Sequence, residues 1–535
     1  MIRIRGGTLV DGTGAPGRRA DVLLHGDRVA ILEPDADPDR SLDGAGPDVE
    51  IVDAAGKVVA PGFIDLHSHS GLVLLADGRH EPKLRQGVTT EVIGVDGLSY
   101  APLSRPADLE DLIVMNAGLD GRPDGLEATW DTTASYLERF DGRVSLNVAF
   151  LVGNSALRID ALGWGDVPAD DAAIARMRGR LAEAMRDGAF GVSSGLDYPP
   201  GAYAPTDELV ELASEAGRHG GIYHTHVRYP LGDRFLDPFR EAIEIGRRAG
   251  APAHITHFYH RESFPGGPDE MLALVDDARA EGLDVTFDAY PYEWASTRLL
   301  ILIPIWAQDG GPAATKARLA ERSVRDRIRA ELQERGVLFA GRGGLADVRL
   351  GAFTRPEHRA WEGETLGRYC AATGTDPVDA ICDLLLREDL RVNEVTPGPH
   401  TDGIRRFYRH QAAMIGTDST FVGAKPSPRT YGSYPRVLGQ FVRDEAVLTL
   451  EDAVHRMAGA PAARLGLRDR GVLRDGAAAD VVVFDPARVR ANATYDEPTR
   501  YPDGIEHVFV AGVGVVRGGR HTGATPGGAL RRGRD

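Results

Sequence analysis

Hydrophobic and polar positions alternate at both ends of the chain. Residues 4–14, 20–32, 49–62, 471–486 and 505–523 carry short apolar runs that Gly and Asp interrupt. A period of two residues with turn residues between the runs is typical of short antiparallel strands. We therefore predict that the two ends of the chain together form one small β-sandwich domain.

The middle of the chain has a different pattern. Amphipathic segments such as 169–188 and 206–220 predict helices, and they separate short, almost continuously apolar runs. Apolar runs of this kind predict parallel strands that are covered on both faces. The candidate strands are 58–69, 89–97, 144–153, 189–196, 220–228, 251–259, 283–292 and 412–420.

Eight strand–helix units predict an α/β fold, a (β/α)₈ TIM-like barrel. An open doubly wound sheet is the alternative, although no GxGxxG motif follows the first strand. Residues 293–400 contain no clear strand of the barrel type and predict an excursion or lid. The predicted domains are the N-terminal half of the β-domain (1–60), the barrel (61–450, with the excursion at about 293–400), and the C-terminal half of the β-domain with the tail (451–535). The last residues, 527–535, have the composition of a disordered tail.

Composition narrows the functional classes. The chain has 535 residues, 42% of them hydrophobic, and a net charge of −17, which argues against a general nucleic-acid or membrane-surface binder. The two cysteines exclude a disulfide framework and a Cys-rich zinc module. No secretory signal or long apolar stretch is visible. We expect a cytoplasmic protein that acts on a small molecule, with its oligomeric state open.

Histidines and an aspartate stand at the ends of several predicted strands. His67 and His69 are two residues apart, so their side chains share a face of the first strand. His226, His257 and Asp418 end three further strands, at the edge where barrel enzymes place their chemistry. A set of imidazoles and carboxylates suits Zn²⁺ or a similar divalent ion. The pattern predicts a metal site at the barrel mouth.

Three other histidines lie close to these positions but are not predicted as ligands. His224 shares a strand face with His226, which allows either a supporting hydrogen bond or a substrate contact. His254 is expected earlier in its strand as a core or supporting group, and His260 in a loop.

The motifs along the chain resemble one family. PGFIDLHSH, THVR, ITHF and MIGTDS occur in this order, with longer matches such as GVSSGLDYPPGAYAPTDELVELA and PRTYGSYPRVLGQFVRD. In nearly its whole length the chain resembles the amidohydrolase superfamily and, within it, the D-aminoacylases (N-acyl-D-amino-acid deacylases). The resemblance implies a zinc hydrolase on a (β/α)₈ barrel that acts on non-peptide C–N bonds, with one or two metal ions.

The resemblance also implies roles for single residues. His67, His69, His226 and His257 match metal ligands of the family. Asp418 matches the catalytic aspartate, which takes a proton from the attacking water and passes it to the leaving amine. Residues that match contacts to the substrate carboxylate are Tyr290, Ser296 and Arg429.

The second strand departs from the family pattern. Where the family has Asn-Cys, with a metal-binding cysteine, this chain has Val95-Asp96. A carboxylate can bridge two metal ions or bind one, so Asp96 is predicted as a metal ligand; a turn residue is the alternative. A carboxylated lysine is the other bridging ligand of the superfamily. None of the four lysines ends a predicted barrel strand, which favours Asp96.

Further departures surround the substrate. Asn154 stands where the family has a histidine, Phe258-Tyr259 where it has His-Lys, and Ser427 where it has a histidine; His224 replaces a small residue. The first hypothesis is hydrolysis of an N-acyl-D-amino acid or a similar carboxylate-bearing amide. The alternative is a hydrolase of a cyclic amide or imide. A remote third hypothesis is a metal-binding protein without catalysis.

Overall fold

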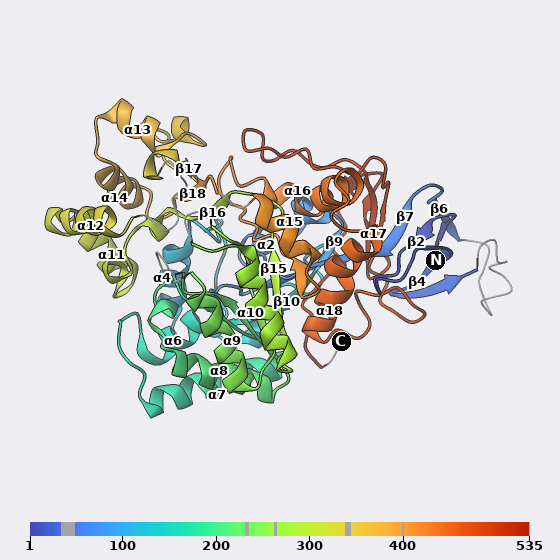
Figure 1. Ribbon diagram of the computed structural model, residues 1–535, viewed down its shortest axis with the longest axis horizontal. Helices are drawn as coiled ribbons and strands as arrows, with labels where there is room; N and C mark the ends of the chain where they lie inside the picture. The colour runs from blue at the N-terminus through green and yellow to red at the C-terminus, as the bar shows by residue number, and fades with distance from the viewer. Residues whose placement is uncertain (34–48, 230–234, 262–264, 337–343, 399–400, 534–535) are drawn as a thin grey trace.

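Three regions of the molecule lie in a row. The structure, a computed structural model, places a barrel in the centre, an α/β insertion with helices α11–α14 at one end, and a β-sandwich with the N-terminus at the other (Figure 1). It describes residues 1–33, 49–229, 235–261, 265–336, 344–398 and 401–533. Among these, no helix is both long enough and apolar enough to cross a membrane.

The barrel contains the eight predicted strands in chain order, and every pair of neighbours is parallel. Leu151 separates β10 from β11, which together act as one interrupted strand. The ring closes between the first and last strands, where Asp418 N donates to His67 O (2.9 Å) and His69 N to Ser419 O (3.0 Å). The predicted (β/α)₈ barrel is confirmed. Its strands are β8 (Phe63–Asp65), β9 (Val88–Ile93), β10 (Asn147–Phe150), β11 (Val152–Gly153), β12 (Gly191–Gly195), β13 (Ile222–His226), β14 (Ala253–Ile255), β15 (Val285–Ala289) and β19 (Ala413–Ile415).

Helices follow most of the strands and cover the barrel. The amphipathic segments predicted at 169–188 and 206–220 form α7 and α8, whose buried apolar faces pack on each other and, for α8, on β12 and β13. The covering helices are α2 (Val73–Ala76), α3 (Glu81–Leu84), α4 (Pro106–Asn116), α5 (Thr133–Leu137), α6 (Asn154–Leu162), α7 (Asp171–Asp187), α8 (Thr206–Arg218), α9 (Asp237–Ala249), α10 (Pro268–Ala280), α15 (Thr401–Arg409), α16 (Arg429–Arg436), α17 (Leu450–Val454) and α18 (Ala460–Leu465), with π-helices η7 (Val437–Asp444) and η8 (His455–Gly459).

Both ends of the chain build the β-sandwich. The N-terminal β7 pairs antiparallel with the C-terminal β20, and apolar residues from both ends fill the space between the two sheets. The first sheet has the order β5 (Arg28–Leu32), β4 (Asp21–His25), β1 (Ile2–Arg5), β6 (Glu50–Asp53). The second has the order β23 (Arg520–His521), β22 (Val513–Arg517), β21 (Ile505–Val510), β20 (Val481–Phe484), β7 (Val58–Pro61), β2 (Thr8–Leu9), β3 (Arg18–Arg19).

The predicted excursion corresponds to an insertion with its own core. Its sheet is antiparallel and its first strand, β16, reaches the barrel mouth, where the Ser296 carbonyl accepts from Arg429. The predicted end at residue 400 lies outside the described residues. A second boundary was predicted at residues 450/451, between the barrel and the C-terminal half of the β-domain. Beyond it, η8 and α18 both pack on the barrel strand β8, and η8 also packs on β19, so these two helices lie with the barrel. The insertion contains β16 (Ala295–Arg298), β17 (Arg349–Gly351), β18 (Asn393–Thr396), α11 (Gly311–Ala320), α12 (Arg322–Arg335), α13 (Leu366–Thr373) and α14 (Pro377–Arg387).

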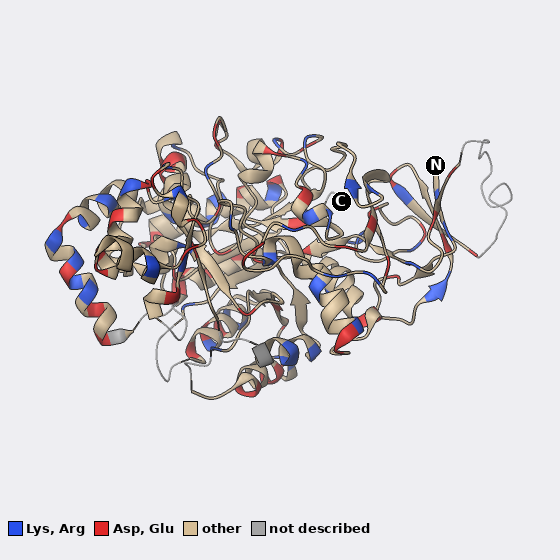
Figure 2. Cartoon of the chain, turned by 90° about the horizontal axis from the view of Figure 1, so that it is seen from above, with Lys and Arg blue, Asp and Glu red and all other residues tan. Residues whose placement is uncertain are grey.

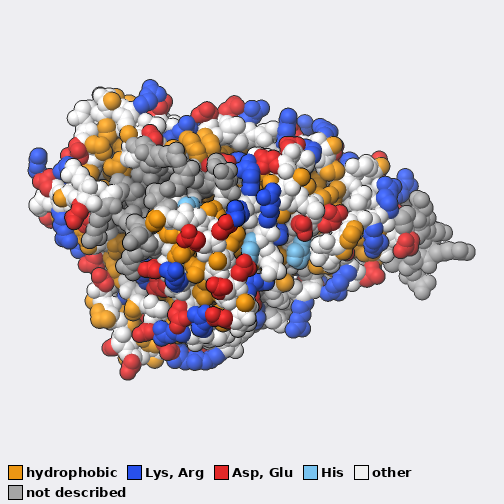
Figure 3. Space-filling model, viewed as in Figure 1, with side chains coloured by type: hydrophobic (Ala, Val, Ile, Leu, Met, Phe, Trp, Pro, Cys, Tyr) orange, Lys and Arg blue, Asp and Glu red, His pale blue; other side chains and the backbone are white. Residues whose placement is uncertain are grey.

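Acidic and basic residues are intermixed along the chain and on the surface (Figures 2 and 3). On the face drawn in Figure 3, blue and red atoms alternate over the barrel helices. The net charge of −17 is therefore spread rather than concentrated on that face.

The prediction of a disordered tail is wrong for residues 527–533. Gly527 and Ala529 form β-bridges with Val144 and Val148, and Leu530 is buried in the apolar cluster at the bottom of the barrel. Arg531 pairs with Asp141 at 2.6 Å. The composition of this segment indicated disorder, but the burial of Leu530 and the backbone pairing beside β10 keep the segment in a fixed position. Residues 534 and 535 lie outside the described residues.

Truncation of Leu530 tests whether the tail stabilises the barrel. We expect Leu530→Ala to lower the free energy of unfolding by about 2–4 kcal/mol, because it leaves a cavity among buried side chains. Thermal or urea unfolding measures the change. The matched control is Val513→Ala, an exposed aliphatic residue of the sandwich, for which less than about 0.5 kcal/mol is expected. Equal effects of the two substitutions would contradict a stabilising tail.

Candidate metal centre

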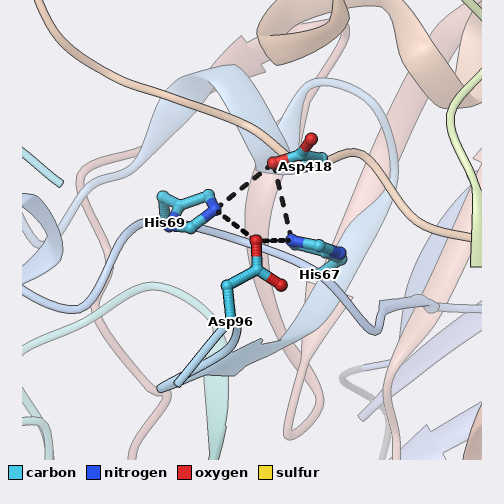
Figure 4. Close-up of side chains that lie close together, drawn as sticks. All are labelled: His67, His69, Asp96 and Asp418. Carbon is cyan, nitrogen blue, oxygen red and sulfur yellow. Dashed lines mark ion pairs between the residues drawn. The ribbon is translucent and has the colours of Figure 1, made fainter. Parts of the chain in front are cut away.

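Four side chains from three strand ends converge at the barrel mouth (Figure 4). The Asp96 carboxylate lies between His67 and His69, with Oδ2 at 3.3 Å from His67 Nε2 and 3.6 Å from His69 Nε2. Asp418 Oδ1 faces the same two nitrogens, at 3.5 Å and 3.3 Å. All four side chains are buried. The first strand thus presents both imidazoles to one point, as the two-residue spacing predicts.

The same oxygen of Asp96 also faces a second group of donors. Oδ2 lies 3.6 Å from His226 Nδ1 and 3.6 Å from His257 Nε2, and these two nitrogens are 2.8 Å apart. One carboxylate oxygen is therefore shared by four imidazoles from three strands. This position between two donor groups is the one that a bridging ligand of two metal ions requires.

Local backbone geometry aims these side chains. Asp96, His257 and Asp418 have positive φ values of 52°, 33° and 48°, a left-handed conformation that non-glycine residues rarely adopt. Each of them lies two or three residues after the last residue of a barrel strand, where the chain turns so that the side chain faces the mouth. Gly195 makes room for this turn, since a Cβ there would lie 1.9 Å from the Asp96 carbonyl oxygen. Strain of this kind is concentrated at functional sites.

Hydrogen-bonding partners fix the outer nitrogens of the histidines. Asp120 Oδ1 lies 2.7 Å from His69 Nδ1, Asp197 Oδ2 lies 3.0 Å from His226 Nε2, and the Tyr229 hydroxyl lies 2.9 Å from His257 Nδ1. Asp288 Oδ2 also faces His67 Nδ1, but at 3.7 Å it is beyond hydrogen-bonding distance. Such partners orient metal-binding histidines and raise their basicity.

The sequence-based prediction missed these four supporting residues. Asp197 and Asp288 stand at or just beyond strand ends, so the rule that identified Asp418 could have found them. Asp120 follows α4 in a loop, and Tyr229 follows the THVR motif; no periodicity marks either of them.

The donor set fits a divalent metal ion. His67 is fully buried, and among the described residues neither of its ring nitrogens has a hydrogen-bond partner. A buried imidazole without partners is costly unless a ligand uses its lone pair. The carboxylates are in the form that binds metal: burial raises the pKa of Asp96, but His67, His226 and His257 lower it well below its usual range.

Asp418 is held as an anion by a neighbouring arginine. Arg429 Nη1 lies 2.9 Å from Asp418 Oδ2, and the guanidinium is fully buried. Burial alone would raise the pKa of Asp418, but the charges of Arg429 and, to a smaller extent, His67 outweigh burial and lower the pKa to about 2. Asp418 is therefore a carboxylate at neutral pH and can accept a proton.

The other two residues matched to the substrate carboxylate, Tyr290 and Ser296, lie beside this arginine. The Arg429 guanidinium lies over the Tyr290 ring, 4.6 Å from its centroid, and Nη2 donates to the Ser296 carbonyl at 2.8 Å. Arg429 Nε is buried and has no hydrogen-bond partner among the described residues. A donor is thus available for an incoming carboxylate, and the substrate roles of these residues remain predictions.

His224 lies deeper than the mouth. Its ring stacks on His254 (5.1 Å between centroids), and Nε2 lies 3.2 Å from the Leu66 carbonyl. His254 in turn contacts Asp288 at 3.0 Å, which agrees with the expected supporting position. This placement favours a supporting role for His224. The alternative, a contact between His224 and the substrate, remains a prediction.

Lys83, on α3, is fully buried beneath the site and pairs with Asp65 and Glu91. Its ammonium is held by two carboxylates, which favours Asp96 as the shared ligand.

A closed (β/α)₈ barrel with histidines and carboxylates gathered at the carboxyl ends of its strands defines a metal-binding barrel enzyme. The amidohydrolase family model matches residues 50–516. The chain belongs to the amidohydrolase family and, within it, to the D-aminoacylases.

The relatives agree over almost the full length. The D-aminoacylase of Alcaligenes xylosoxydans xylosoxydans is 35% identical over 99% of this chain and 97% of its own length. The crystal structure of N-acyl-D-glutamate deacylase from Bordetella bronchiseptica, in complex with zinc and a phosphonate inhibitor, is 34% identical and covers 99% of both chains with a TM-score of 0.80. A structure of D-aminoacylase with a binuclear metal centre is 32% identical, again over 99% of both chains, with a TM-score of 0.79.

Loss of the Asp96 charge tests its position as a shared ligand. We expect Asp96→Asn to lower the metal content of dialysed protein by about one ion per chain and to weaken the remaining affinity about 10–100-fold, because a neutral amide is a poorer bridging donor. Elemental analysis and competition with a chelating dye measure both quantities. Asp108→Asn, on α4, is the matched control and should keep the wild-type content. Unchanged metal content and affinity in Asp96→Asn would exclude Asp96 as a ligand.

Proposed function

We propose that the protein hydrolyses the amide C–N bond of N-acyl-D-amino acids with one or two divalent metal ions, zinc first among them. The observation that carries the proposal is the shared Asp96 oxygen between two histidine pairs, next to the Asp418–Arg429 ion pair. The relatives add the D configuration of the amino acid and the identity of the metal.

The residues that would hold the metal are His67, His69, Asp96, His226 and His257. A bound divalent cation acidifies water and polarises the amide carbonyl. The chain contributes the geometry: burial excludes bulk water, and Asp120, Asp197 and Tyr229 hold three of the imidazoles in place.

Asp418 is the base of the proposed reaction. Its carboxylate faces His67 and His69 with Oδ1, so it lies beside the position of the attacking water. It would hold the proton removed from this water and then return it to the leaving nitrogen. Arg429, with Tyr290 and Ser296 around it, would orient the substrate through its α-carboxylate; a planar guanidinium suits a carboxylate particularly well.

The base assignment predicts a loss of turnover without a loss of metal. We expect Asp418→Asn to lower kcat about 10²–10⁴-fold, since the amide cannot accept the proton, while metal content stays at the wild-type value. Steady-state kinetics on N-acetyl-D-amino acids, with elemental analysis, test this. Asp444→Asn, at the exposed end of η7, is the control. A near wild-type rate for Asp418→Asn would show that another group is the base.

Removal of the arginine predicts a shift in the pH profile. Asp418 acts when ionised, so activity is lost as pH falls through its pKa, and Arg429 lowers this pKa. Arg429→Met should therefore raise the pKa and move the acidic limb of kcat/KM to higher pH, besides raising KM. Arg436→Met, on the same helix but paired with Glu293, is the control. An acidic limb at the wild-type position would contradict a direct influence of Arg429 on the base.

A further inference from the structure

A second buried arginine lies beside the substrate side of the metal centre. Arg261 follows the ligand His257 by four residues and is only 6% exposed. Its Nη2 donates to the Tyr259 hydroxyl at 2.9 Å, and its guanidinium lies 5.3 Å from the ring centroids of both Tyr229 and Tyr259. The guanidinium thus packs against a wall of tyrosine rings.

This wall runs without a break from one arginine to the other. Arg429 lies over Tyr290, the Tyr290 and Tyr259 rings are 6.2 Å apart, and Tyr259 contacts Arg261. The wall also touches the metal centre, since Tyr229 stacks on Tyr259 at 5.5 Å and its hydroxyl contacts His257. Arg429 and Arg261 therefore lie at the two ends of one row of aromatic rings.

A third ionisable group lies in the insertion, on the strand that pairs with β16 near the metal centre. Glu394 on β18 pairs across the sheet with Thr297, whose hydroxyl lies 3.0 Å from that of Tyr198, and Tyr198 packs on His226. Glu394 is fully buried, and its Oε1 has no hydrogen-bond partner among the described residues.

Glu394 does not neutralise the two arginines at neutral pH. Burial raises its pKa to about 8, although Thr396, Arg429 and Arg261 act in the opposite direction. At pH 7 about nine-tenths of such a group is protonated, so it presents a hydrogen-bond donor instead of a negative charge. Together with Arg261, the Tyr259 hydroxyl and a protonated Glu394 can then donate to an anion.

We infer that Arg261, the Tyr259 hydroxyl and Glu394 form a subsite for a second carboxylate, so that the preferred substrates are N-acyl derivatives of acidic D-amino acids. The inference rests on the proposed function, in which Arg429 takes the α-carboxylate. The two carboxyl carbons of glutamate are four bonds apart, roughly 5 Å when extended, which suits the spacing of the Tyr290 and Tyr259 rings.

Substrate comparison on the zinc-loaded wild-type enzyme is the first test. N-acetyl-D-glutamate, N-acetyl-D-glutamine and N-acetyl-D-methionine have similar length but differ in charge and polarity. We expect kcat/KM for the glutamate derivative to exceed the other two at least about 10-fold, because a charge-assisted pair in a buried pocket discriminates strongly. Equal values, or a preference for methionine, would overturn the subsite. Failure to hydrolyse any of the three would instead overturn the proposed function.

Substitution of the arginine is the second test. Arg261→Met removes the charge at similar length and should lower kcat/KM for the glutamate derivative about 10–100-fold, while the methionine derivative changes less than about threefold. Arg261→Lys should recover some of the glutamate activity. Arg240→Met, an exposed arginine on α9, controls for the loss of a surface charge. An equal loss on all three substrates in Arg261→Met would show a structural role and overturn the inference.

Discussion

One carboxylate oxygen organises the mouth of the barrel. Asp96 Oδ2 faces four imidazoles at 3.3–3.6 Å, and these imidazoles come from the first, fifth and sixth strands. A buried group of this density is stable only when each member has a partner, because unpaired buried polar groups are costly. The demand for partners explains the surrounding shell: Asp120, Asp197 and Tyr229 each take the outer nitrogen of one histidine.

The barrel makes this arrangement rigid. Its closing hydrogen bonds join the backbone of His67 and Asp418, so the first and last strands are tied together by the same residues that carry the chemistry. Asp288 adds a second tie, since its Oδ1 accepts from His257 N at 2.9 Å while Oδ2 faces His67 and His254. Positive φ values at three site residues are maintained because these ties come from several strands at once.

The sequence was sufficient to predict the barrel, the sandwich and the convergence of the strand-end histidines. These features follow from periodicity and from a general property of parallel strands, whose carboxyl ends meet at one edge. Asp120 and Tyr229 were missed because they lie in loops, where no period relates sequence to position. The tail was mistaken for disorder because composition does not reveal that Leu530 packs into a buried apolar cluster of the barrel. The Asp418–Arg429 pair was also not predicted, as it depends on how α16 packs over the mouth.

The pairing of β7 with β20 has a consequence for the order of assembly. β7 is among the first strands to be synthesised, yet its partner is made only after the whole barrel and the insertion. During synthesis the N-terminal strands therefore have an unpaired edge on β7 while the barrel forms beside them. Only a chain that has been translated as far as β20 can cover this edge of β7. A prematurely terminated chain therefore exposes an unpaired strand edge, which is a site for aggregation or for recognition by chaperones.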